Sequence, residues 1–534
     1  MHPHPHQTPR VGVVVIGYDD AAHIAHAVRS ALAQGPAVRE VVAVDDCSTD
    51  GSHELLTRLA GTEPRVRVIR RETNSGGCGS PRNAGIDAVT SPYVMFLDSD
   101  DVLPPGAVDA LLAAAEEELA EVVGGLCVRR ELPSGREVPW QESLYARRTV
   151  LTRPEQLPRL VHDTLCVNKL YRTDFLREHA IRFPEGRFPY EDIVFTARVL
   201  AAAPRLALIP DRVYVWNVRR SAARLSISLD RADVGNWRAR TEANRQAYEI
   251  LLGAGRKKLA RTARAKFLDH ELRMYARELG LRDAEYRRAW WAQTREHLGE
   301  YDAADWAADP AAPGRLLARV VMASPEPRDL GRLKELAARP ARLCPPYARA
   351  EDGTPLWSAD LPQVTLEPYL TRPAHQLPLA VDAALRPRAR ATVLRLRLHE
   401  MYGRVAAARP RALEVEWRHR ETGRPAAGPV TVPLALSADD TWSAETTVDL
   451  TTLGAGTWDL RLSVSFADGT SREVTAHART GAGLLRRSVV PSLRFGVLLA
   501  QPYATHSSAL SVRLATGLRG VTSVLRGRLR RLLR

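Results

Sequence analysis

The stretch Pro92-Tyr93-Val94-Met95-Phe96-Leu97-Asp98-Ser99-Asp100-Asp101 decides how this chain is interpreted. Five β-prone apolar residues, 93–97, predict a buried parallel strand, and three carboxylates follow it at once. Open α/β sheets bind ligands at the carboxyl ends of their strands, and clustered carboxylates there suit a hard divalent cation, Mg²⁺ or Mn²⁺, on a diphosphate. An acidic turn that caps the next helix is the simpler alternative.

Strands and helices alternate on both sides of this stretch. Three further buried strands are predicted at residues 11–16, 38–44 and 66–70, and helices at residues 23–34, 53–60, 81–89 and 108–117. Such alternation favours a doubly wound parallel sheet with right-handed crossovers. We therefore expect the carboxylates to lie at the ligand-binding edge of an α/β domain.

The composition is that of an ordinary soluble protein with more than one domain. The 534 residues are 45% hydrophobic and 26% charged, and the length suggests about three domains. No apolar run approaches the ~20 residues of a membrane span, and residues 1–10 form a short tail without a signal peptide's hydrophobic segment, so a cytoplasmic protein is expected. The five cysteines contain no Cys-x-x-Cys pair, which argues against a zinc site or a disulfide framework.

Three motifs stand in order within the first domain: Asp45-Asp46-Cys47-Ser48-Thr49-Asp50-Gly51-Ser52, the glycine-rich turn that leads to Arg82-Asn83-Ala84-Gly85, and Asp98-Ser99-Asp100. In this order and spacing they resemble family 2 glycosyltransferases of the GT-A fold, over residues 11–228. The resemblance implies a Rossmann-like catalytic domain that moves a sugar, with inversion, from a nucleotide diphosphate sugar, usually a UDP sugar. One departure is the loop after the first strand, Ile16-Gly17-Tyr18-Asp19, where the family has Pro-x-Tyr-Asn.

The resemblance implies roles for residues that would bind the nucleoside. Tyr18 would pack against the base, and Asp45 or Asp46 would bond the uracil edge. Asp98, with Ser99 beside it, would approach the ribose. A planar base needs an aromatic face, which agrees with this assignment. The simpler alternatives are core packing for Tyr18 and turn formation for the two aspartates.

The resemblance also implies partners for the phosphates. Arg82 would face the base or the phosphates, with an ion pair to Glu72 or Asp87 as the alternative. Asp100 would hold the metal ion, Mn²⁺ or Mg²⁺, because a leaving diphosphate needs its charge neutralised. Lys169 lies in a segment that resembles the family's approach to the acceptor site, with an exposed surface cation as the alternative.

An acidic pair, Glu191-Asp192, begins a predicted helix and resembles the family's catalytic motif, in which the aspartate is the base. An inverting displacement needs one carboxylate to deprotonate the acceptor hydroxyl. Acidic residues are also common in the first turn of any helix. Further on, Arg219 or Arg220, followed by Ser226, resembles the family segment that closes over the diphosphate, and an arginine fork suits that contact.

The rest of the chain changes period twice. Residues 231–345 show helical spacing and predict a helical linker, whereas residues 346–480 alternate with period two and predict an immunoglobulin-like antiparallel β-sandwich. A catalytic domain followed by such modules resembles the poly(polyol phosphate) glycosyltransferases that decorate wall teichoic acid. The implied acceptor is an anionic or polyol-phosphate glycopolymer. A polysaccharide chain synthase and a non-catalytic carbohydrate-binding scaffold are the alternatives.

The C-terminal segment, residues 481–534, is strongly basic. It holds ten arginines and no acidic residue, within a net charge of +14 for the chain. Apolar residues at helical spacing predict a membrane-surface helix on anionic lipid, at the inner face of the cell membrane, and these residues are Leu510, Leu514, Leu518, Val521, Leu525, Leu529 and Leu532. A helix docked on the sandwich and a helix paired with its copy in a homo-oligomer are the alternatives. No recognition motif supports nucleic-acid binding.

Overall fold

A computed structural model describes residues 10–219, 230–386, 392–437, 441–478, 488–492, 494–505 and 507–517. The chain divides into two compact units, the first ending at Phe267 and the second beginning at Leu268. Among the described residues, no helix combines the length and the apolar character that crossing a membrane requires.

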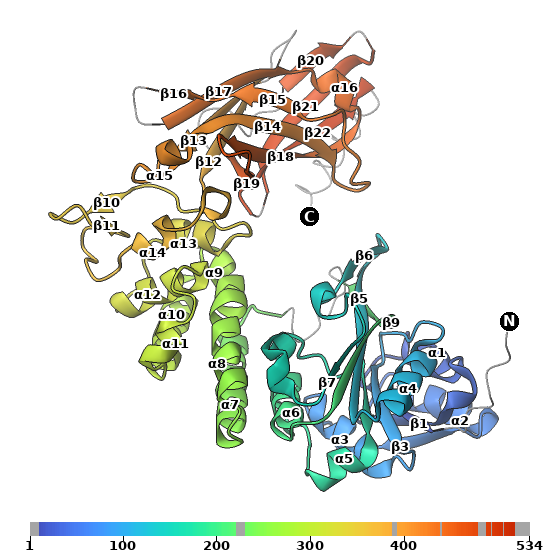
Figure 1. The fold of residues 1–534 in the computed structure, drawn as a ribbon. Coiled ribbons are helices and arrows are strands. Elements are labelled where there is room, and N and C mark those ends of the chain that lie inside the picture. The colour runs from blue at the N-terminus through green and yellow to red at the C-terminus, as the bar shows by residue number, and fades with distance from the viewer. Residues whose placement is uncertain are drawn as a thin grey trace. The chain divides into compact units, whose positions relative to one another are not determined.

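A nine-stranded sheet forms the centre of the first unit (Figure 1). Its strand order is β3-β2-β1-β4-β8-β5-β9-β7, with β6 paired to β5. The pairs β1–β2, β2–β3 and β1–β4 are parallel, which confirms the predicted doubly wound core, whereas β8 runs antiparallel between β4 and β5. The strands are β1 (Val11–Gly17), β2 (Val38–Asp45), β3 (Val66–Arg70), β4 (Tyr93–Asp98), β5 (Val122–Leu132), β6 (Arg136–Pro139), β7 (Thr149–Leu151), β8 (Lys169–Arg172) and β9 (Leu206–Arg219).

Helices cover both faces of this sheet, with α1 and α4 on one side and α3 and α5 on the other (Figure 1). Helix α3 approaches β1 closely because Gly85 has no side chain, and a Cβ there would overlap with Val14. The helices of the first unit are α1 (Ile24–Leu32), α2 (Ser52–Thr62), α3 (Gly79–Ala88), α4 (Ala107–Glu118), α5 (Thr173–Glu178), α6 (Glu191–Ala201), α7 (Val234–Gly253) and α8 (Lys257–Lys266).

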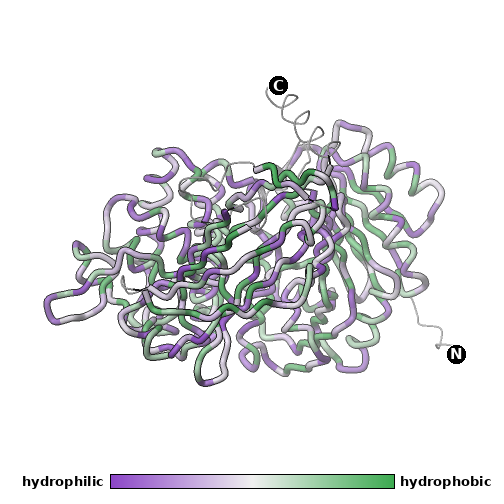
Figure 2. The backbone as a smooth tube through the Cα atoms, turned by 90° about the horizontal axis from the view of Figure 1, so that it is seen from above, coloured by the Kyte–Doolittle hydropathy of each residue, from purple (hydrophilic) through white to green (hydrophobic). Residues whose placement is uncertain are grey.

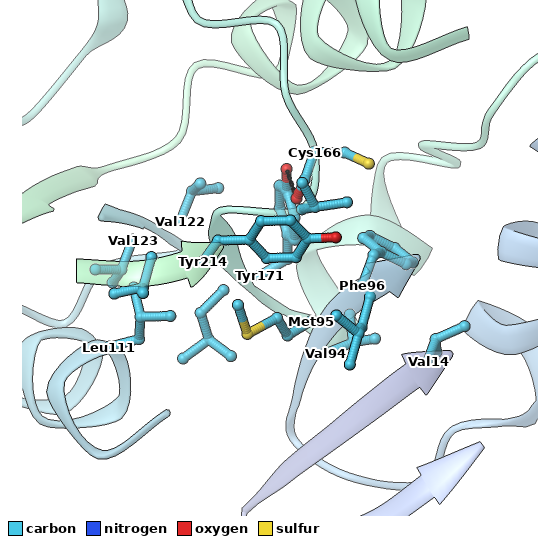
Figure 3. Close-up of a cluster of buried hydrophobic side chains, with 14 of the residues drawn as sticks. Val14, Val94, Met95, Phe96, Leu111, Val122, Val123, Cys166, Tyr171 and Tyr214 are labelled. Carbon is cyan, nitrogen blue, oxygen red and sulfur yellow. Dashed lines mark hydrogen bonds between the residues drawn. The ribbon is translucent and has the colours of Figure 1, made fainter. Parts of the chain in front are cut away.

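The apolar run that predicted the central strand is buried. Figure 3 shows Val94, Met95 and Phe96 of β4 beside Val14 of β1 and Tyr171 of β8. The Phe96 ring lies 5.8 Å from the ring of Tyr171 and 5.3 Å from that of Phe183. Phe183 in turn stacks on Phe195 of α6, with 3.8 Å between ring centroids. This aromatic cluster ties α6 to the strand that ends in the carboxylates.

The first unit extends beyond the predicted domain boundary at residue 230. Helices α7 and α8 belong to it, because α7 packs on α6. The hydroxyl of Tyr190, just before α6, donates to Asn236 of α7 at 2.6 Å, and the Arg240 guanidinium lies 3.7 Å from the Tyr190 ring. The helical period predicted after residue 230 is present, and its first two helices, α7 and α8, complete the first unit.

The second unit begins with short helices. They are α9 (Arg273–Leu279), α10 (Ala284–Gly299), α11 (Ala303–Ala307), α12 (Pro313–Ala323) and α13 (Leu330–Ala337), followed later by α14 (Glu367–Leu370), α15 (Arg404–Ala408) and α16 (Leu450–Leu453). The aromatic residues of this part, such as Trp290 and Trp291, are fully buried. They form part of the core of the second unit.

Antiparallel strands follow in the predicted region. The strands that the alternating pattern predicted are found: β13 carries Leu394, Leu396 and Leu398, and β14 and β18 pair antiparallel. Strand β19 pairs parallel with β12 and antiparallel with β18, so it links two sets of strands. The strands are β10 (Ala348–Arg349), β11 (Pro355–Leu356), β12 (Val381–Arg386), β13 (Thr392–His399), β14 (Pro410–His419), β15 (Val430–Pro433), β16 (Ala435–Leu436), β17 (Thr441–Val448), β18 (Gly456–Phe466), β19 (Ser471–Ala478), β20 (Ser488–Ser492), β21 (Gly496–Ala504) and β22 (Leu510–Thr516).

The prediction of a basic helix from Leu510 onward is wrong for residues 510–516. These residues form strand β22, which pairs with β18 and β21. The side chains of Leu510, Val512 and Leu514 are buried, so the alternation with period two, and not the spacing of four, determines the structure. Figure 2 shows hydrophobic stretches of the backbone interrupted by hydrophilic ones. The predicted helical stripe from Leu518 to Leu532 lies outside the described residues.

Candidate active site

Polar loops meet where β1, β2 and β4 end, because these three strands are neighbours in the parallel part of the sheet. The Ser99 hydroxyl donates to Asp20 at 2.7 Å, and the backbone N–H of Asp20 donates to the Ser52 hydroxyl at 3.0 Å. The Asp19 carboxylate accepts from the Thr49 N–H at 2.7 Å. The loops after β1, β2 and β4, two of which carry the motifs at residues 45–52 and 98–100, therefore converge on one edge of the sheet.

Asp45 and Asp46 lie at this edge with different surroundings. The Asp46 side chain holds the glycine-rich loop, since it accepts from the Ser75 hydroxyl at 2.8 Å and from the Asn74 amide at 3.1 Å. Asp45 is fully buried and accepts from the Ser48 N–H at 3.2 Å. Its Oδ1 has no hydrogen-bond partner among the described residues. Tyr18 lies nearby in the chain, partly exposed at the end of β1.

Arg82 joins three carboxylates from two parts of the chain. The residue is only 2% exposed. Its Nη1 donates to Glu191 at 2.5 Å and to Asp192 at 3.1 Å, and its Nη2 donates to Asp98 at 2.7 Å. The alternative in which Arg82 pairs with Glu72 or Asp87 finds no support, since Asp87 pairs with Arg182.

The segment that leads to α6 is clamped by the motif that contains Arg82. The Asn83 amide donates to the Phe183 carbonyl at 3.0 Å and to the Glu185 carboxylate at 2.9 Å. The Asn83 side-chain oxygen accepts from the Phe183 N–H at 2.9 Å. Gly79 touches the same segment, and a Cβ there would overlap with the carbonyl of Pro184. The start of α6 is therefore fixed against the start of α3.

Glu191 and Asp192 form a buried acidic pair at the first turn of α6. Burial, followed by repulsion from Asp192, raises the pKa of Glu191 to about 7, although Arg82 opposes the shift. Burial also raises the pKa of Asp192 above its ordinary value, whereas the charge of Arg82 and hydrogen bonds from Cys166 lower it. Cys166 is fully buried, and burial raises its thiol pKa, so the thiol stays protonated and can donate.

Asp100 is the exposed member of the β4 carboxylates, with 43% of its side chain accessible. Its carboxylate pairs with Arg219 of β9 at 2.9 Å. Burial, followed by repulsion from Asp98, raises the pKa of Asp100 to about 6. Asp101 points the other way and accepts from the Tyr214 hydroxyl at 2.8 Å and the Asn217 N–H at 2.7 Å. Of the three carboxylates, Asp98 and Asp100 are thus accessible, whereas Asp101 is buried and pairs with β9.

The site fits a hard cation in one limited way. Among the described residues, no group of three or more histidine, cysteine or acidic side chains forms a metal cage. Asp100 offers an accessible carboxylate that Asp98 and Asp20 repel, and a cation there would relieve this repulsion. Mg²⁺ commonly takes one or two carboxylates and completes its ligands with phosphates and water. Asp100 is therefore a suitable single protein ligand for a cation on a diphosphate.

Lys169 is buried, so the alternative of an exposed surface cation is wrong. Its amine donates to the Asp163 carboxylate at 2.8 Å and to the Leu165 carbonyl at 2.5 Å. Asp163 also accepts from Trp140 and Tyr145. This cluster supports the segment that carries Cys166.

Two predicted residues cannot be placed, because Arg220 and Ser226 lie outside the described residues. The sequence interpretation assigned no role to Asp20, Asp101 or Cys166. Asp101 lies inside the opening stretch, and Asp20 directly follows the quoted loop of residues 16–19. Counting every carboxylate in and beside those loops would have found both. Cys166 carries no local signal, because its relation to Asp192 depends on the folded chain.

This sheet topology, with an acidic motif after β4 and an acidic pair at α6, defines a GT-A nucleotide-sugar transferase fold. Residues 12–180 match the family model described as glycosyl transferase family 2, and this part of the chain is a family 2 glycosyltransferase domain.

Two curated relatives illustrate the match. The succinoglycan biosynthesis protein ExoO of Rhizobium meliloti is 32% identical over 232 residues, which cover 42% of this chain and 66% of ExoO. The poly(ribitol-phosphate) beta-N-acetylglucosaminyltransferase TarS of Staphylococcus aureus is 31% identical over 222 residues, which cover 41% of this chain and 37% of TarS. The chain thus spans just under two thirds of one relative and little more than a third of the other.

Solved structures show the same fold. The crystal structure of S. aureus TarS aligns with a TM-score of 0.54 at 20% identity, covering 95% of this chain and 85% of TarS. A TarS fragment in complex with UDP-GlcNAc aligns with a TM-score of 0.52 at 22% identity, covering 66% of this chain and 98% of the fragment. The likeness therefore extends through both units.

Proposed function

We propose that this chain is an inverting, metal-dependent glycosyltransferase that moves a sugar from UDP to a cell-envelope glycopolymer. The observation that carries the proposal is the Arg82 cluster, in which the donor-site carboxylate Asp98 and the acidic pair Glu191-Asp192 share one guanidinium. The proposed donor-binding edge and the proposed general base therefore both contact the same side chain, that of Arg82.

Asp192 acts as the base in this proposal. The acceptor hydroxyl gives its proton to Asp192 while its oxygen forms a bond to the anomeric carbon. The bond from that carbon to the diphosphate oxygen breaks, and UDP leaves with the electron pair. Attack from the face opposite the diphosphate inverts the anomeric configuration.

Asp100 would hold Mn²⁺ or Mg²⁺ together with the diphosphate. The bound ion would neutralise the negative charge that grows on the leaving diphosphate. Arg219 pairs with Asp100 at 2.9 Å, beside the proposed cation ligand, which supports its assignment to the phosphates. Arg220 and Ser226 remain assigned to the same role by the resemblance.

The nucleoside would lie across the ends of β1 and β2. Tyr18 offers an aromatic face, and Asp45 or Asp46 an acceptor for the base edge. Both Asp45 and Asp46 have a buried Oδ1 without a hydrogen bond, but the Oδ1 of Asp46 lies 2.9 Å from Arg71, and the Oδ2 of Asp46 already holds Ser75 and Asn74. Asp98 and Ser99 would lie near the ribose. The burial of Lys169 supports a structural role instead of a donor contact.

The acceptor is proposed from the relatives. TarS is named for a poly(ribitol-phosphate) acceptor, and an anionic polyol-phosphate polymer is therefore our first candidate. ExoO is named for succinoglycan biosynthesis, which keeps a polysaccharide chain synthase as the second candidate. A non-catalytic scaffold is disfavoured because the carboxylates of the site are intact.

We further propose that residues 518–534 bind an anionic membrane surface, so that the enzyme works at the inner face of the cell membrane. Six arginines and a leucine-rich stripe in this segment supply charge and apolar attraction. Self-association through the same segment is the alternative.

A screen of nucleotide sugars by thermal shift, with and without Mn²⁺, tests the donor and the cation together. The donor that stabilises the protein is then incubated with poly(ribitol phosphate) or with an undecorated polysaccharide, and UDP release is measured. Donor-dependent UDP release that only the first acceptor stimulates supports the proposal. Metal-independent release, or the absence of stabilisation by any UDP sugar, would contradict it.

A further inference from the structure

The burial and the hydrogen bonds of Arg82 indicate its role more directly than the motif in which it stands. An arginine that contacts a nucleotide keeps part of its fork accessible, whereas the Arg82 guanidinium is enclosed. Both of its terminal nitrogens are used by carboxylates, and its Nε is buried without a partner among the described residues. Three of the five N–H groups of the guanidinium donate to these carboxylates, and with only 2% of the residue exposed the fork is closed to a phosphate or a base.

The contacts of Arg82 instead cross between two functional elements. Nη2 holds Asp98, the last residue of β4, while Nη1 holds both Glu191 and Asp192 at the start of α6. The planar fork fixes directions as well as distances, which a lysine amine would not do. The carboxylate that must accept a proton is thereby oriented relative to the strand that ends in the donor site.

We infer that Arg82 is a positioning residue, which orients the Asp192 base and the adjacent Glu191 by bridging them to Asp98, and that it is not a nucleotide ligand. This inference rests on the proposed function for the role of Asp192. It departs from the expectation that Arg82 faces the base or the phosphates.

Arg82 also sets the charge balance of the pair. It is the positive charge among the groups that face Glu191 and Asp192, and it opposes their protonation. The titratable and charged side chains around the pair come from the turn before α3, from α3, β4, the turn before β8, and β8: Cys78, Arg82, Asp98, Cys166 and Tyr171. Within the part of the chain that the structure describes, removing Arg82 leaves only acidic or neutral groups among those named here.

The variants Arg82→Lys and Arg82→Gln test the inference in the full-length chain. Lysine keeps the charge and loses the fork, and glutamine loses both. Arg182→Gln is the matched control, because Arg182 lies on the same segment as Phe183 and pairs with the exposed Asp87. UDP affinity is measured by calorimetry, and turnover is measured across pH.

We expect UDP affinity to stay within about threefold of wild type in both variants, while turnover falls by about tenfold to a hundredfold through misorientation of the base. Without the guanidinium the pKa of Asp192 rises, so the pH at which activity appears moves upward. The move is larger for Arg82→Gln than for Arg82→Lys, and the control keeps the wild-type profile. A tenfold or greater loss of UDP affinity with an unchanged pH profile would show Arg82 to be a nucleotide ligand instead.

A second measurement does not depend on activity. The ionised pair loses its partner in Arg82→Gln, whereas the protonated pair loses much less. The difference in Tm between wild type and this variant should therefore grow as the pH rises from about 5 to about 8. A difference that is independent of pH would overturn the inference. If the wild type transfers no sugar, the proposed function fails, but this comparison still decides the role of Arg82. Should Arg82→Gln not fold, the comparison of UDP affinity with turnover in Arg82→Lys carries the test, because lysine keeps the charge but cannot orient both carboxylates.

Discussion

Asp192 and Glu191 share one arginine but differ in what else they contact. Asp192 has 22% of its side chain accessible and receives hydrogen bonds from Cys166, whereas Glu191 has 11% accessible. A base must be reachable by the acceptor and held in one orientation, and Asp192 meets both conditions better. Glu191, with a pKa of about 7, is partly protonated near neutral pH.

The substitution Asp192→Asn keeps the shape of the side chain but cannot accept a proton. We expect turnover to fall by about 10² to 10⁴, as is typical for the loss of a general base, with donor affinity near wild type. Steady-state kinetics and calorimetry with UDP measure the two quantities. If nucleotide affinity collapses instead, Asp192 belongs to the donor site and the base lies elsewhere.

The substitution Asp100→Ala removes the accessible carboxylate of the proposed cation site. We expect it to abolish transfer and to remove the Mn²⁺-dependent part of UDP binding, because the ion loses its protein ligand. UDP affinity with and without Mn²⁺ measures this effect. Asp211→Ala, at an exposed position of β9, is the control. Undiminished Mn²⁺-dependent activity in Asp100→Ala would reject the assignment.

For single residues, the sequence predicts which motif residues belong to the site better than it predicts their hydrogen-bond and ion-pair partners. Asp98, Asp100 and Asp192 follow from strand ends and from the family resemblance. The partners of Arg82 do not, because Glu191 and Asp192 stand 109 and 110 residues away along the chain. The burial of Lys169 could not be predicted from the sequence either, because its partner Asp163 belongs to none of the recognised motifs.

Among the elements, the contact between the start of α3 and the segment before α6 is the most demanding. Gly79 lies against the Pro184 carbonyl, and Gly77 would bring a Cβ to 2.6 Å from the Gly186 carbonyl. Because backbone packs directly on backbone here, there is no room for side chains. The glycine-rich loop therefore allows the start of α3 and the segment before α6 to pack closely. Its glycines therefore have a structural explanation in addition to any role in nucleotide binding.

The substitution Gly79→Ala should displace the segment before α6. Overpacking of this kind costs about 1–3 kcal/mol, and we expect turnover to fall with stability because Asp192 moves. Gly61→Ala in α2 is the matched control: a Cβ there meets nothing within 4 Å, and alanine should stabilise the helix by about 0.5–1 kcal/mol. Chemical denaturation and kinetics of both variants provide the measurement. Equal stability of the two variants would contradict the packing argument.

Element prediction succeeded where one period was unambiguous. The first four strands were placed to within a residue or two, because each is an apolar run between turns. It failed at residues 510–516, since Leu510 and Leu514 satisfy a helical spacing and an alternating one equally well. The intervening Val512 favours the strand, but only pairing with β18 and β21 decides it.

For the whole molecule, the position of the last described strand, β22, determines which truncation is informative. Removing residues 481–534 would delete β20, β21 and β22 and uncover part of β18, where the buried Trp458 lies opposite Val512 of β22. Removing residues 518–534 leaves every described strand in place. Only the shorter truncation separates a surface-binding role of the tail from the stability of the fold.

Deletion of residues 518–534 should leave kinetics on a short soluble acceptor nearly unchanged, yet release the protein from anionic vesicles. Each basic residue near such a surface contributes about 1 kcal/mol, and salt weakens this attraction. Vesicle co-sedimentation at two salt concentrations measures the effect. Light scattering on the same proteins tests the alternative: a lower solution mass with unchanged vesicle binding would identify the tail as an oligomer contact.

Strand β19 has a consequence for how the second unit opens. Its backbone pairs with β12 through residues 476–478 and with β18 through residues 471–475. Loss of β19 would therefore remove backbone hydrogen bonds from both β12 and β18. Amide hydrogens of β12 and β18 should therefore exchange with deuterium in one concerted event at a common opening free energy, as in a single foldon. Mass-spectrometric exchange would reveal this as correlated labelling of the two strands. Independent labelling would show two separately opening layers.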